Sequence, residues 1–435
     1  MPSAAFTTLG CKVNQYETQR ILDSFADAGF SIVPFDQSAD VYVINTCSVT
    51  SQAEAKSRYT VRKANRTNPD AKVVVTGCAV QMGINKGEPM EGADVLVPNP
   101  EKLETLKYFF RENPSFERWA HAEPSQVRPE PKEGRTRATL KIQDGCSVMC
   151  SYCSIPYTRP GMVSRPWQEV LAEAQLLREK GYHEAVLTGV LIGAYGPETG
   201  SGGKSFEEMV TILSEQSGLE RIRISSIEMH QVTQPIIDLA KEGRVVPHFH
   251  IPLQSGDTGV LKDMNRRYTQ ADYLALCADL YQQLPDLTLT TDIMVGFPTE
   301  SEERFLSSVK VCEEVRYLKG HIFRFSPRFG TPADQWGDPV TPQEKQDRSK
   351  RLTEITERTG REQSARFIGR TMRVLVERKR KDGLLEGTSD NWLTVRFAGP
   401  IEYLKSLRWI RLDEERDGVL YGEPVSRPTN SLRVV

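Results

Sequence analysis

Three cysteines lie within one short stretch of this sequence, Cys146-Ser-Val-Met-Cys150-Ser-Tyr-Cys153. Thiolate is the soft ligand that iron–sulfur clusters use, and three thiols leave one iron of a four-iron cluster without a protein ligand. An open coordination position is where a metal centre does chemistry. A structural zinc site would need a fourth Cys or His close by, and the next His along the chain is His183. The stretch therefore predicts a catalytic iron–sulfur cluster rather than a zinc site or three unrelated buried thiols.

The composition is that of an ordinary globular protein, with 38% hydrophobic and 26% charged residues in 435. No apolar run approaches the ~20 residues of a membrane span, and no basic segment with an apolar stretch opens the sequence. We expect a cytoplasmic protein that has no contact with a membrane. In a reducing compartment the eight cysteines are metal ligands or buried thiols rather than disulfides. The net charge of −2 confines any nucleic-acid binding to local patches.

The first 120 residues alternate strand-like and helix-like patterns, which predicts a small doubly wound α/β domain. Helical patterns follow three short β-branched runs, Ala4–Thr8, Val41–Asn45 and Lys72–Thr76. One cysteine follows closely behind each run, and these are Cys11, Cys47 and Cys78. Because the carboxyl ends of parallel strands share one edge of a sheet, where ligands bind, we expect the three thiols to converge there.

These thiols allow two interpretations. Cysteines at strand ends can simply be packed, but all three cysteines of this region occupy such a position. The sequence therefore favours a second iron–sulfur cluster with an open iron. The helix after Cys47 carries a basic run that is either a solvated face or a phosphate-binding surface beside the cluster: Lys56, Arg58, Arg62, Lys63 and Arg66.

Residues 121–134 are proline-rich and aperiodic, and they are interpreted as a linker between the domain at 1–120 and a second domain at 135–368. The second domain repeats a strand and a helix six times, with strands expected at Thr139–Ile142, Glu184–Thr188, Arg221–Ser226, His248–Leu253, Thr288–Met294 and His321–Phe325. Six units are too few for a closed eight-stranded barrel. We expect an open partial (β/α)6 barrel with its chemistry at the C-terminal ends of the strands.

Residues at these strand ends are candidates for a cofactor pocket, in which an arginine can pair a carboxylate. In strand order they are Thr188, Gly189, Ser226, Glu228, Gln254, Arg267, Asp292 and Val295. Taken singly, Glu228 and Asp292 could equally be capping or pairing residues. Two cysteines inside helical patterns, Cys277 and Cys312, are assigned to core packing.

Residues 369–435 are expected to form a small OB-like β-barrel, a frequent nucleic-acid binder. A capping box at Thr341–Glu344 opens the long helix that precedes it. The five short strands are expected at Met372–Glu377, Leu384–Thr388, Leu393–Phe397, Trp409–Asp413 and Val419–Glu423. A basic run occupies the first hairpin tip: Arg378, Lys379, Arg380 and Lys381. Such a run is either solvated or binds RNA, and the neighbouring Trp392 favours RNA.

This order of parts resembles the radical-SAM methylthiotransferases, whose terminal barrel is called a TRAM domain. The motifs that carry the resemblance span essentially the whole chain: Thr8-Leu-Gly-Cys11-Lys-Val-Asn-Gln-Tyr-Glu17, Asn45-Thr-Cys47, Thr76-Gly-Cys78, Gln143-Asp-Gly-Cys146 and Pro252-Leu-Gln-Ser-Gly256. The residues from Cys11 to Glu17 are similar to the branch that modifies N6-threonylcarbamoyladenosine beside the tRNA anticodon.

The resemblance implies a tRNA-modifying transferase with two [4Fe–4S] clusters and S-adenosyl-L-methionine. It implies that the cluster on Cys146, Cys150 and Cys153 cleaves S-adenosylmethionine reductively to a 5′-deoxyadenosyl radical, with Tyr152 beside the adenine. That radical takes hydrogen from C2 of the modified adenosine at tRNA position 37. The cluster on Cys11, Cys47 and Cys78 delivers sulfur that a second S-adenosylmethionine methylates. The resemblance also implies an electron donor such as flavodoxin or ferredoxin, and we expect a monomer.

Some positions depart from the family, and no catalytic role is assigned to them: the apolar run after Thr188-Gly189, Met229 and Phe325. Three alternatives to the main interpretation stay open. The enzyme could methylthiolate isopentenyladenosine in tRNA, or it could methylthiolate a ribosomal protein. From a different class, the chain could be a non-catalytic iron–sulfur protein that binds tRNA.

Overall fold

The computed structural model describes residues 1–117 and 136–428, and the chain forms two compact units. The first unit comprises the described residues up to 117 together with residues 145–149 and 153–161. The second comprises residues 136–144, 150–152 and 162–428. The predicted linker at 121–134 lies outside the described residues. Each unit is treated by itself below.

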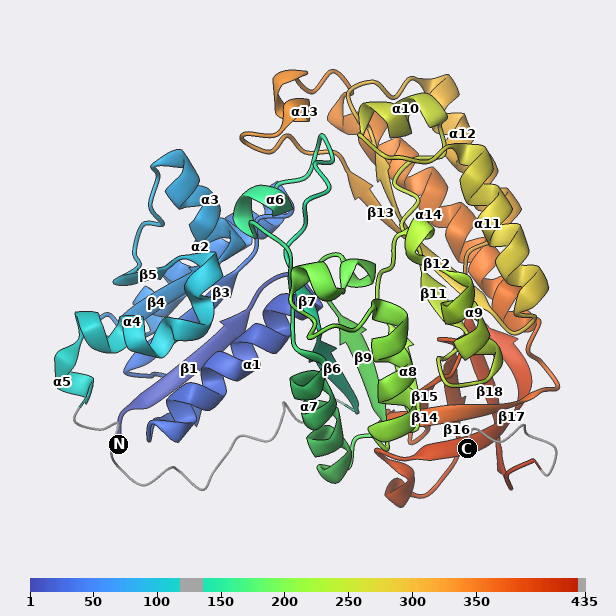
Figure 1. Cartoon of the computed structure of the whole chain (residues 1–435), viewed down its shortest axis with the longest axis horizontal. Coiled ribbons are helices and arrows are strands. Elements are labelled where there is room, and N and C mark those ends of the chain that lie inside the picture. Colours follow the sequence, from blue (N-terminus) through green and yellow to red (C-terminus); the bar gives the residue numbers. More distant parts are fainter. Residues whose placement is uncertain (118–135, 429–435) are drawn as a thin grey trace. The chain divides into compact units, whose positions relative to one another are not determined.

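The first unit is built on a five-stranded parallel sheet of order β2-β1-β3-β4-β5 (Figure 1). Its strands are β1 (Ser3–Thr8), β2 (Ser31–Val33), β3 (Val41–Thr46), β4 (Lys72–Gly77) and β5 (Val95–Val97). The three predicted strands are present as β1, β3 and β4. Two short edge strands, β2 and β5, were not predicted, because three residues are too few to display a period.

Helices cover both faces of this sheet. They are α1 (Lys12–Asp27), α2 (Ser51–Thr67), α3 (Cys78–Lys86), α4 (Thr105–Glu112), the short α5 (Pro114–Glu117) and a 3-10 segment at Asn99–Glu104. Alternate residues of β3 point to opposite cores: Val43 packs with Phe25 and Phe109 of α1 and α4, and Ile44 packs with Val61 of α2. This alternation confirms the doubly wound α/β prediction.

The second unit contains the six predicted strands of the partial barrel: β6 (Arg137–Lys141), β9 (Glu184–Thr188), β10 (Arg221–Ile224), β11 (His248–His250), β12 (Thr288–Val295) and β13 (Lys319–Arg324). They pair in parallel as β6-β9-β10 and β11-β12-β13, and bridges at Ile222–Val245 and Ser226–His250 join the two halves. In the described part of the chain β13 does not pair with β6, so the barrel is open, as expected.

Helices on the outside of these strands close the main core. They are α7 (Trp167–Glu179), α8 (Phe206–Gln216), α9 (Gln234–Lys241), α10 (Thr258–Asp263), α11 (Gln270–Gln283) and α12 (Glu302–Val315). Two thiols predicted to be core residues, Cys277 of α11 and Cys312 of α12, are buried in this core. Burial raises the pKa of each thiol to about 12. Inert, protonated thiols of this kind are packing residues.

The long helix α14 (Pro342–Ala365) begins with the predicted capping box of Thr341 and Glu344. A closed barrel of order β14-β15-β16-β18-β17 follows. Its strands are β14 (Thr371–Lys379), β15 (Leu385–Ser389), β16 (Thr394–Phe397), β17 (Leu407–Arg416) and β18 (Val419–Val425). The five predicted strands are confirmed, and the closed form agrees with a small OB-like barrel. Among the described residues, none of the helices is both long and apolar enough to cross a membrane.

The β15–β16 hairpin seats this small barrel against the six-stranded one within the second unit. The ring of Trp392 stacks on His248 with centroids 5.1 Å apart, and the guanidinium groups of Arg137 and Arg223 lie 4.5 and 4.7 Å from its centroid. Arg221 and Arg223 donate hydrogen bonds to carbonyl groups of Thr388, Ser389 and Asp390. Trp392 is therefore engaged inside the protein, and it does not support the RNA interpretation of the hairpin tip.

Candidate iron–sulfur sites and cofactor pocket

The three N-terminal cysteines lie at one edge of the first unit's sheet. Cys11 immediately precedes α1, Cys47 follows β3, and Cys78 is the first residue of α3. The strands β1, β3 and β4 are direct neighbours, with Thr8 opposite Asn45 and Thr46 opposite Gly77. Cys47 and Cys78 are buried, whereas Cys11 is exposed. The parallel topology thus brings together thiols that are far apart in sequence.

Glycine makes this close approach possible. Gly10 has φ +92°, and a Cβ built on it would lie 2.7 Å from both Cβ and Sγ of Cys47. Gly77 has φ +101°, and its Cβ would lie within 2.6 Å of the Thr46 backbone. Such a φ is rare for other residues, and contacts this short are not tolerated. Both positions therefore require glycine.

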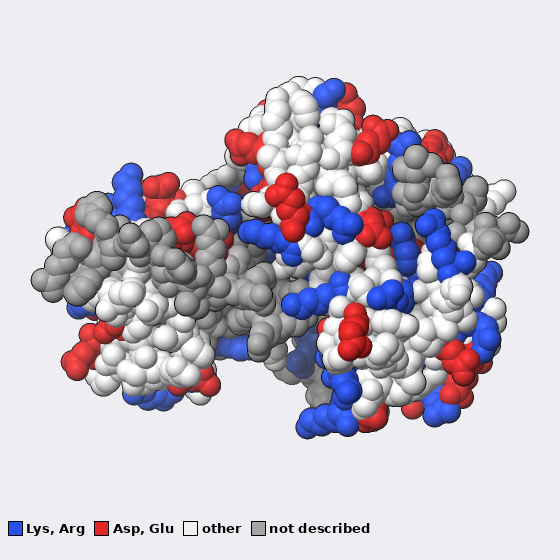
Figure 2. All heavy atoms as spheres, turned by 90° about the horizontal axis from the view of Figure 1, so that it is seen from below, with Lys and Arg blue, Asp and Glu red and all other residues white. Residues whose placement is uncertain are grey.

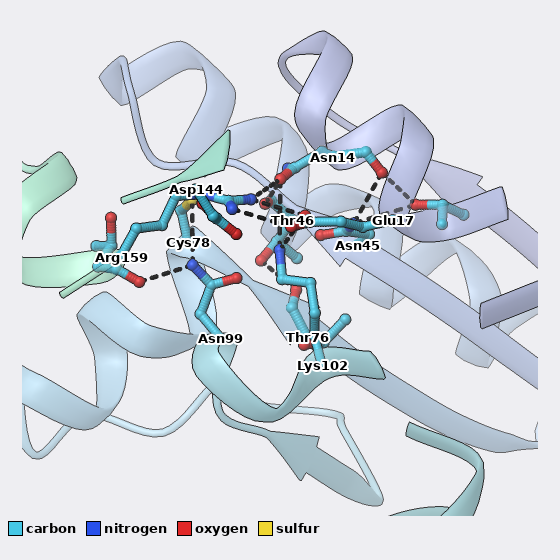
Figure 3. A network of polar contacts seen from close by, with 12 residues as sticks. Asn14, Glu17, Asn45, Thr46, Thr76, Cys78, Asn99, Lys102, Asp144 and Arg159 are labelled. Carbon is cyan, nitrogen blue, oxygen red and sulfur yellow. Dashed lines mark hydrogen bonds and ion pairs between the residues drawn. The ribbon is translucent and has the colours of Figure 1, made fainter. Parts of the chain in front are cut away.

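A buried network of charged and polar side chains lies beside Cys78 (Figure 3). Arg159 donates two hydrogen bonds to Glu17, at 3.0 Å to Oε1 and 2.7 Å to Oε2. The ammonium group of Lys102 lies 2.7 Å from the same Oε2. All three side chains are at most 3% exposed. One buried carboxylate is thus shared by Lys102 and Arg159.

Two asparagines connect this network to the cysteines. Asn14 accepts a hydrogen bond from Arg159 at 2.7 Å and donates to the carbonyl groups of Leu9 and Thr46, both at 2.9 Å. Asn99 Nδ2 lies 3.7 Å from Cys78 Sγ and donates to the Thr158 carbonyl at 2.6 Å. Thr158 and Arg159 follow the second cysteine motif closely in sequence, and they are packed into the first unit.

These residues fit an iron–sulfur cluster. Burial raises the pKa of the Cys47 thiol to about 11, while Arg159 acts in the opposite direction. Metal binding displaces the thiol proton, and a cluster held by three thiolates carries net negative charge. The guanidinium of Arg159 opposes charge of that sign, whereas burial lowers the pKa of Lys102. Cys11, Cys47 and Cys78 are thus suited to hold a cluster, with Arg159 and Lys102 as the nearby positive groups.

The second cysteine motif lies in the loop after the short strand β7 (Gln143–Asp144). Cys146 and Cys153 belong to the first unit, where the Val148 amide donates a hydrogen bond to Cys146 Sγ at 3.4 Å. Cys150 belongs to the second unit, where its neighbour Ser151 is held by the carbonyl groups of Asp263 and Met264 at 2.8 and 3.2 Å. The chain itself keeps the three thiols within eight positions.

In the second unit, Cys150 lies among groups that suit a charged ligand. Burial raises the pKa of its thiol, whereas Arg266 lowers it. Arg266 forms a salt bridge of 2.9 Å with Glu228, and its guanidinium lies 5.8 Å from the centroid of the Tyr268 ring. Tyr152 packs edge-on against Phe297 with centroids 6.4 Å apart. The predicted Arg267 is exposed, so Arg266 is the arginine associated with Glu228.

The loop after β9 is held by a buried glutamine. Oε1 of Gln143 accepts hydrogen bonds from the amides of Val190 and Leu191, at 3.0 and 2.8 Å. A Cβ on Gly189 would lie 3.0 Å from the same Oε1, so a larger residue would require Gln143 to move slightly. The side chain of the neighbouring Thr188 is buried and bonds back to the Val186 carbonyl.

The remaining predicted pocket residues lie on the strands around β12. Ser226 is exposed, and its backbone forms an isolated parallel β-bridge with that of His250. Gln254 has φ +62°, and its amide and carbonyl are bonded to Asp292 and Met294 of β12. Val295 is fully buried in the main core. The side chain of Gln254 thus remains for a ligand, whereas the Val295 carbonyl accepts a hydrogen bond from the Phe325 amide at 2.9 Å.

The positive charge of the predicted RNA-binding run, Arg378 to Lys381, is partly offset by a neighbouring carboxylate. Arg378 and Arg380 both bond to the buried carboxylate of Glu386, as does Arg396 of β16. Lys379 and Lys381 are exposed. In the right-hand part of Figure 2, which shows the underside of the region of β14–β18, basic side chains are interspersed with acidic ones rather than gathered in one continuous patch. Any nucleic-acid contact here depends on these local charges.

Sequence reasoning missed two groups of residues. The first is the network of Glu17, Lys102 and Arg159, whose members pair across the fold and carry no spacing signal. The second is a pair of histidines, His250 and His321, on either side of Asp292. Both histidines stand in predicted strands beside the Asp292 strand, so their positions contained a usable signal.

Comparisons with known proteins agree with this arrangement. Residues 3–97 match the family described as Uncharacterized protein family UPF0004, and residues 140–312 match the Radical SAM superfamily. In fold the chain is similar to the radical S-adenosylmethionine methyltransferase TsrM from Kitasatospora setae, with a TM-score of 0.55 and 12% identity over 77% of this chain and 75% of that one. The chain is a radical-SAM enzyme.

Proteins of similar sequence show to which group of radical-SAM enzymes the chain belongs. The Threonylcarbamoyladenosine tRNA methylthiotransferase MtaB of Bacillus subtilis (strain 168) is 37% identical over 412 residues, which cover 92% of this chain and 91% of the relative. The tRNA-2-methylthio-N(6)-dimethylallyladenosine synthase of Methylobacillus flagellatus is 34% identical, over 96% of this chain and 98% of the relative. The chain belongs to the radical-SAM tRNA methylthiotransferases, and its cofactors are S-adenosyl-L-methionine and [4Fe–4S] clusters.

Proposed function

We propose that this enzyme adds a methylthio group to C2 of N6-threonylcarbamoyladenosine at position 37 of tRNA. The observation that carries the proposal is the similarity to the relatives of that name, which are 33–37% identical over nearly the whole chain. The motif from Cys11 to Glu17 supports the same branch. In the structure its members Asn14 and Glu17 are buried beside the cysteines.

The two cysteine sets take different roles in this proposal. Cys146, Cys150 and Cys153 hold the cluster that binds S-adenosylmethionine, which supplies a carbon-centred radical when it is cleaved. Cys11, Cys47 and Cys78 hold the auxiliary cluster that serves sulfur transfer. The shared edge of β1, β3 and β4 supports the second assignment, since it presents three thiols from one side of a sheet.

Residues of the second unit bind and orient S-adenosylmethionine. Tyr152 lies beside the adenine, and its edge-on contact with Phe297 fixes its ring. Glu228 and Arg266 offer an anion and a cation to the amino and carboxylate groups of the cofactor. The other proposed contacts come from Thr188, Gly189, Ser226, Gln254, Arg267, Asp292 and the backbone of Val295.

Two partners and an oligomeric state follow from the proposal. The anticodon stem-loop of tRNA is the macromolecular substrate, and Arg378, Lys379, Arg380 and Lys381 contact its phosphates. A low-potential electron donor such as flavodoxin or ferredoxin supplies electrons, and the enzyme acts as a monomer. The exposed lysines of the hairpin tip support the RNA contact, because phosphate binding needs accessible cations.

Mass spectrometry of nucleosides from total tRNA, with and without this gene in one host, tests the substrate. The proposal requires that threonylcarbamoyladenosine gain a methylthio group only when the protein is present. A second candidate substrate is isopentenyladenosine, because the Methylobacillus flagellatus relative is nearly as similar. Methylthiolation of that nucleoside would refute the substrate and keep the reaction.

A cysteine variant tests the division of labour between the clusters. Cys11→Ala is expected to keep releasing 5′-deoxyadenosine from S-adenosylmethionine under anaerobic, reducing conditions, yet to insert no sulfur. Loss of both activities would show that the two cysteine sets are not independent. No 5′-deoxyadenosine from the parent enzyme would indicate a binding protein without turnover.

A further inference from the structure

Three potential metal ligands face one another on adjacent strands of the second unit. Nε2 of His250, on β11, lies 3.2 Å from Oδ2 of Asp292, on β12. Nδ1 of His321, on β13, lies 3.3 Å from Oδ1 of the same carboxylate. One ligand atom from each residue can be chosen so that all three lie within 4.8 Å of one another. His250 and Asp292 are partly buried and His321 is exposed, so a path from solvent exists.

The strand pattern places these side chains on the inner face of the partial barrel. Along β12, Leu289, Ile293 and Val295 point into the core formed with the outer helices. Asp292 is in the opposite phase of the strand and is paired in register with His321. The three side chains therefore line the inside of the open barrel.

The carboxylate of Asp292 lies between the two imidazoles. Zinc binds nitrogen and carboxylate oxygen at about 2.0–2.1 Å in a tetrahedron, which separates neighbouring ligand atoms by about 3.3 Å. Nε2 of His250 lies 3.2 Å from Oδ2 and Nδ1 of His321 lies 3.3 Å from Oδ1, so each histidine stands at about that distance from a different oxygen of the Asp292 carboxylate. Nε2 of His250 is buried and makes no well-directed hydrogen bond to any described residue, although the carboxylate oxygen is so close.

A second layer of contacts holds the histidine in place. Nδ1 of His250 lies 2.9 Å from the hydroxyl of Thr290, the residue opposite it in the β11–β12 register. Metal-binding histidines regularly use their other ring nitrogen in such a hydrogen bond, which fixes the tautomer and the ring orientation. The ring of His321 lies 5.6 Å from that of His250, tilted by 39°, so the two imidazoles do not stack face to face.

We propose that His250, Asp292 and His321 form a binding site for a divalent transition-metal ion of the zinc type, separate from the six cluster cysteines. Two imidazoles and a carboxylate are a ligand set that suits zinc, iron, cobalt and nickel rather than magnesium or calcium. Three protein ligands leave at least one position open, as in sites that bind a substrate group. That open position faces the barrel interior and takes an oxygen ligand.

Zinc binding to the full-length enzyme with both clusters loaded tests the site, because loaded clusters occupy the six cysteines. Anaerobic equilibrium dialysis against Zn²⁺, with zinc and iron counted by elemental mass spectrometry, gives stoichiometry and affinity. We expect one saturable zinc per chain. Asp292→Asn and His321→Asn should each weaken binding by at least tenfold while the iron content stays unchanged, which shows that the variants fold and retain their clusters.

His183→Asn is the matched control. Its imidazole also pairs with a carboxylate, that of Glu220 at 2.7 Å, but Arg178 completes that cluster instead of a third metal ligand. This variant should bind zinc like the parent enzyme. The proposal is overturned if the parent takes up no stoichiometric zinc, or if the Asp292 and His321 variants bind zinc as tightly as the control does.

Discussion

Arg159 and Glu17 form a bidentate ion pair, with 2.7 and 3.0 Å between guanidinium nitrogens and carboxylate oxygens, inside the first unit. The two residues are far apart in the chain. Glu17 stands in α1, in the motif that begins at Cys11, whereas Arg159 follows Cys153. The pair therefore fastens the segment after one cysteine motif to the domain that carries the other.

Removing the carboxylate should destabilise this unit strongly. Glu17→Gln leaves Arg159 and Lys102 buried with one fewer negative charge, and breaking a buried ion pair costs about 3–5 kcal/mol. Amide hydrogen exchange in β1 and β3 should therefore become faster by about 100-fold or more. Glu54→Gln removes the exposed partner of Arg58 on α2, and such surface pairs contribute less than about 1 kcal/mol. Equal exchange in both variants would contradict the role of the network.

A pair of glycine variants separates steric from conformational effects at the auxiliary site. Gly10→Ala places a Cβ at 2.7 Å from Cys47 Cβ and Sγ, at φ +92°. Gly87→Ala, at φ +72°, has nothing within 4 Å of its Cβ among the described residues. Both pay the cost of a left-handed alanine, about 1 kcal/mol, but only the first displaces a cysteine.

We therefore expect Gly10→Ala to lose about half of the bound iron, as measured chemically after anaerobic reconstitution, while S-adenosylmethionine cleavage persists. Gly87→Ala should retain the iron of the parent enzyme. Full iron content in both variants would show that the approach of Gly10 to Cys47 is not needed for cluster binding.

These sites differ in how far sequence predicts them. The convergence of the three N-terminal cysteines can be predicted from the sequence. Each cysteine follows a strand-like run, and a parallel sheet gathers the C-terminal ends of its strands at one edge. The partial barrel and the small β-barrel follow from the same patterns. The pairing of Glu17 with Arg159 and Lys102 does not, since it depends on how the segment after Cys153 packs. The sequence likewise does not show that Arg266, rather than Arg267, pairs with Glu228, because adjacent arginines differ only in the direction that the backbone gives them.

A second buried ion cluster predicts how stability depends on pH. Glu184 lies in β9 and bonds Arg223 at 2.7 Å and Arg221 at 3.0 Å, with both arginines buried. Burial alone would raise the pKa of Glu184, but Arg221, Arg223 and Arg137 lower it to about 2 from the ordinary 4.5. A lowered pKa in the folded state contributes stability that is full above pH 4.5 and is lost as the pH falls toward 2.

The contribution is about 3 kcal/mol, since each pKa unit corresponds to 1.36 kcal/mol. Urea unfolding of the parent and of Glu184→Gln, followed between pH 7 and pH 3, measures it. The stability difference between the two should shrink as the medium becomes acidic. Glu215→Gln, which removes the exposed partner of Arg244, should follow the parent throughout. A difference that stays constant with pH would contradict a titrating Glu184.

Two sets of substitutions at the hairpin tip of the small barrel are expected to have opposite effects on tRNA binding. Lys379→Ala with Lys381→Ala removes two exposed cations, so affinity for tRNA should fall and the slope of log K against log salt should become shallower by about 1–2. Glu386→Gln removes the carboxylate that Arg378, Arg380 and Arg396 share, which frees positive charge and should tighten binding.

Filter binding at several salt concentrations measures both effects. Lys107→Ala with Lys350→Ala removes two exposed lysines of α4 and α14 and is the control for net charge. If the control weakens binding as much as the hairpin variant does, the contact is a general attraction and not a site. If Glu386→Gln leaves affinity and salt slope unchanged while Lys379 and Lys381 matter, the RNA is bound by the two lysines alone, and the three arginines serve to hold the hairpin together.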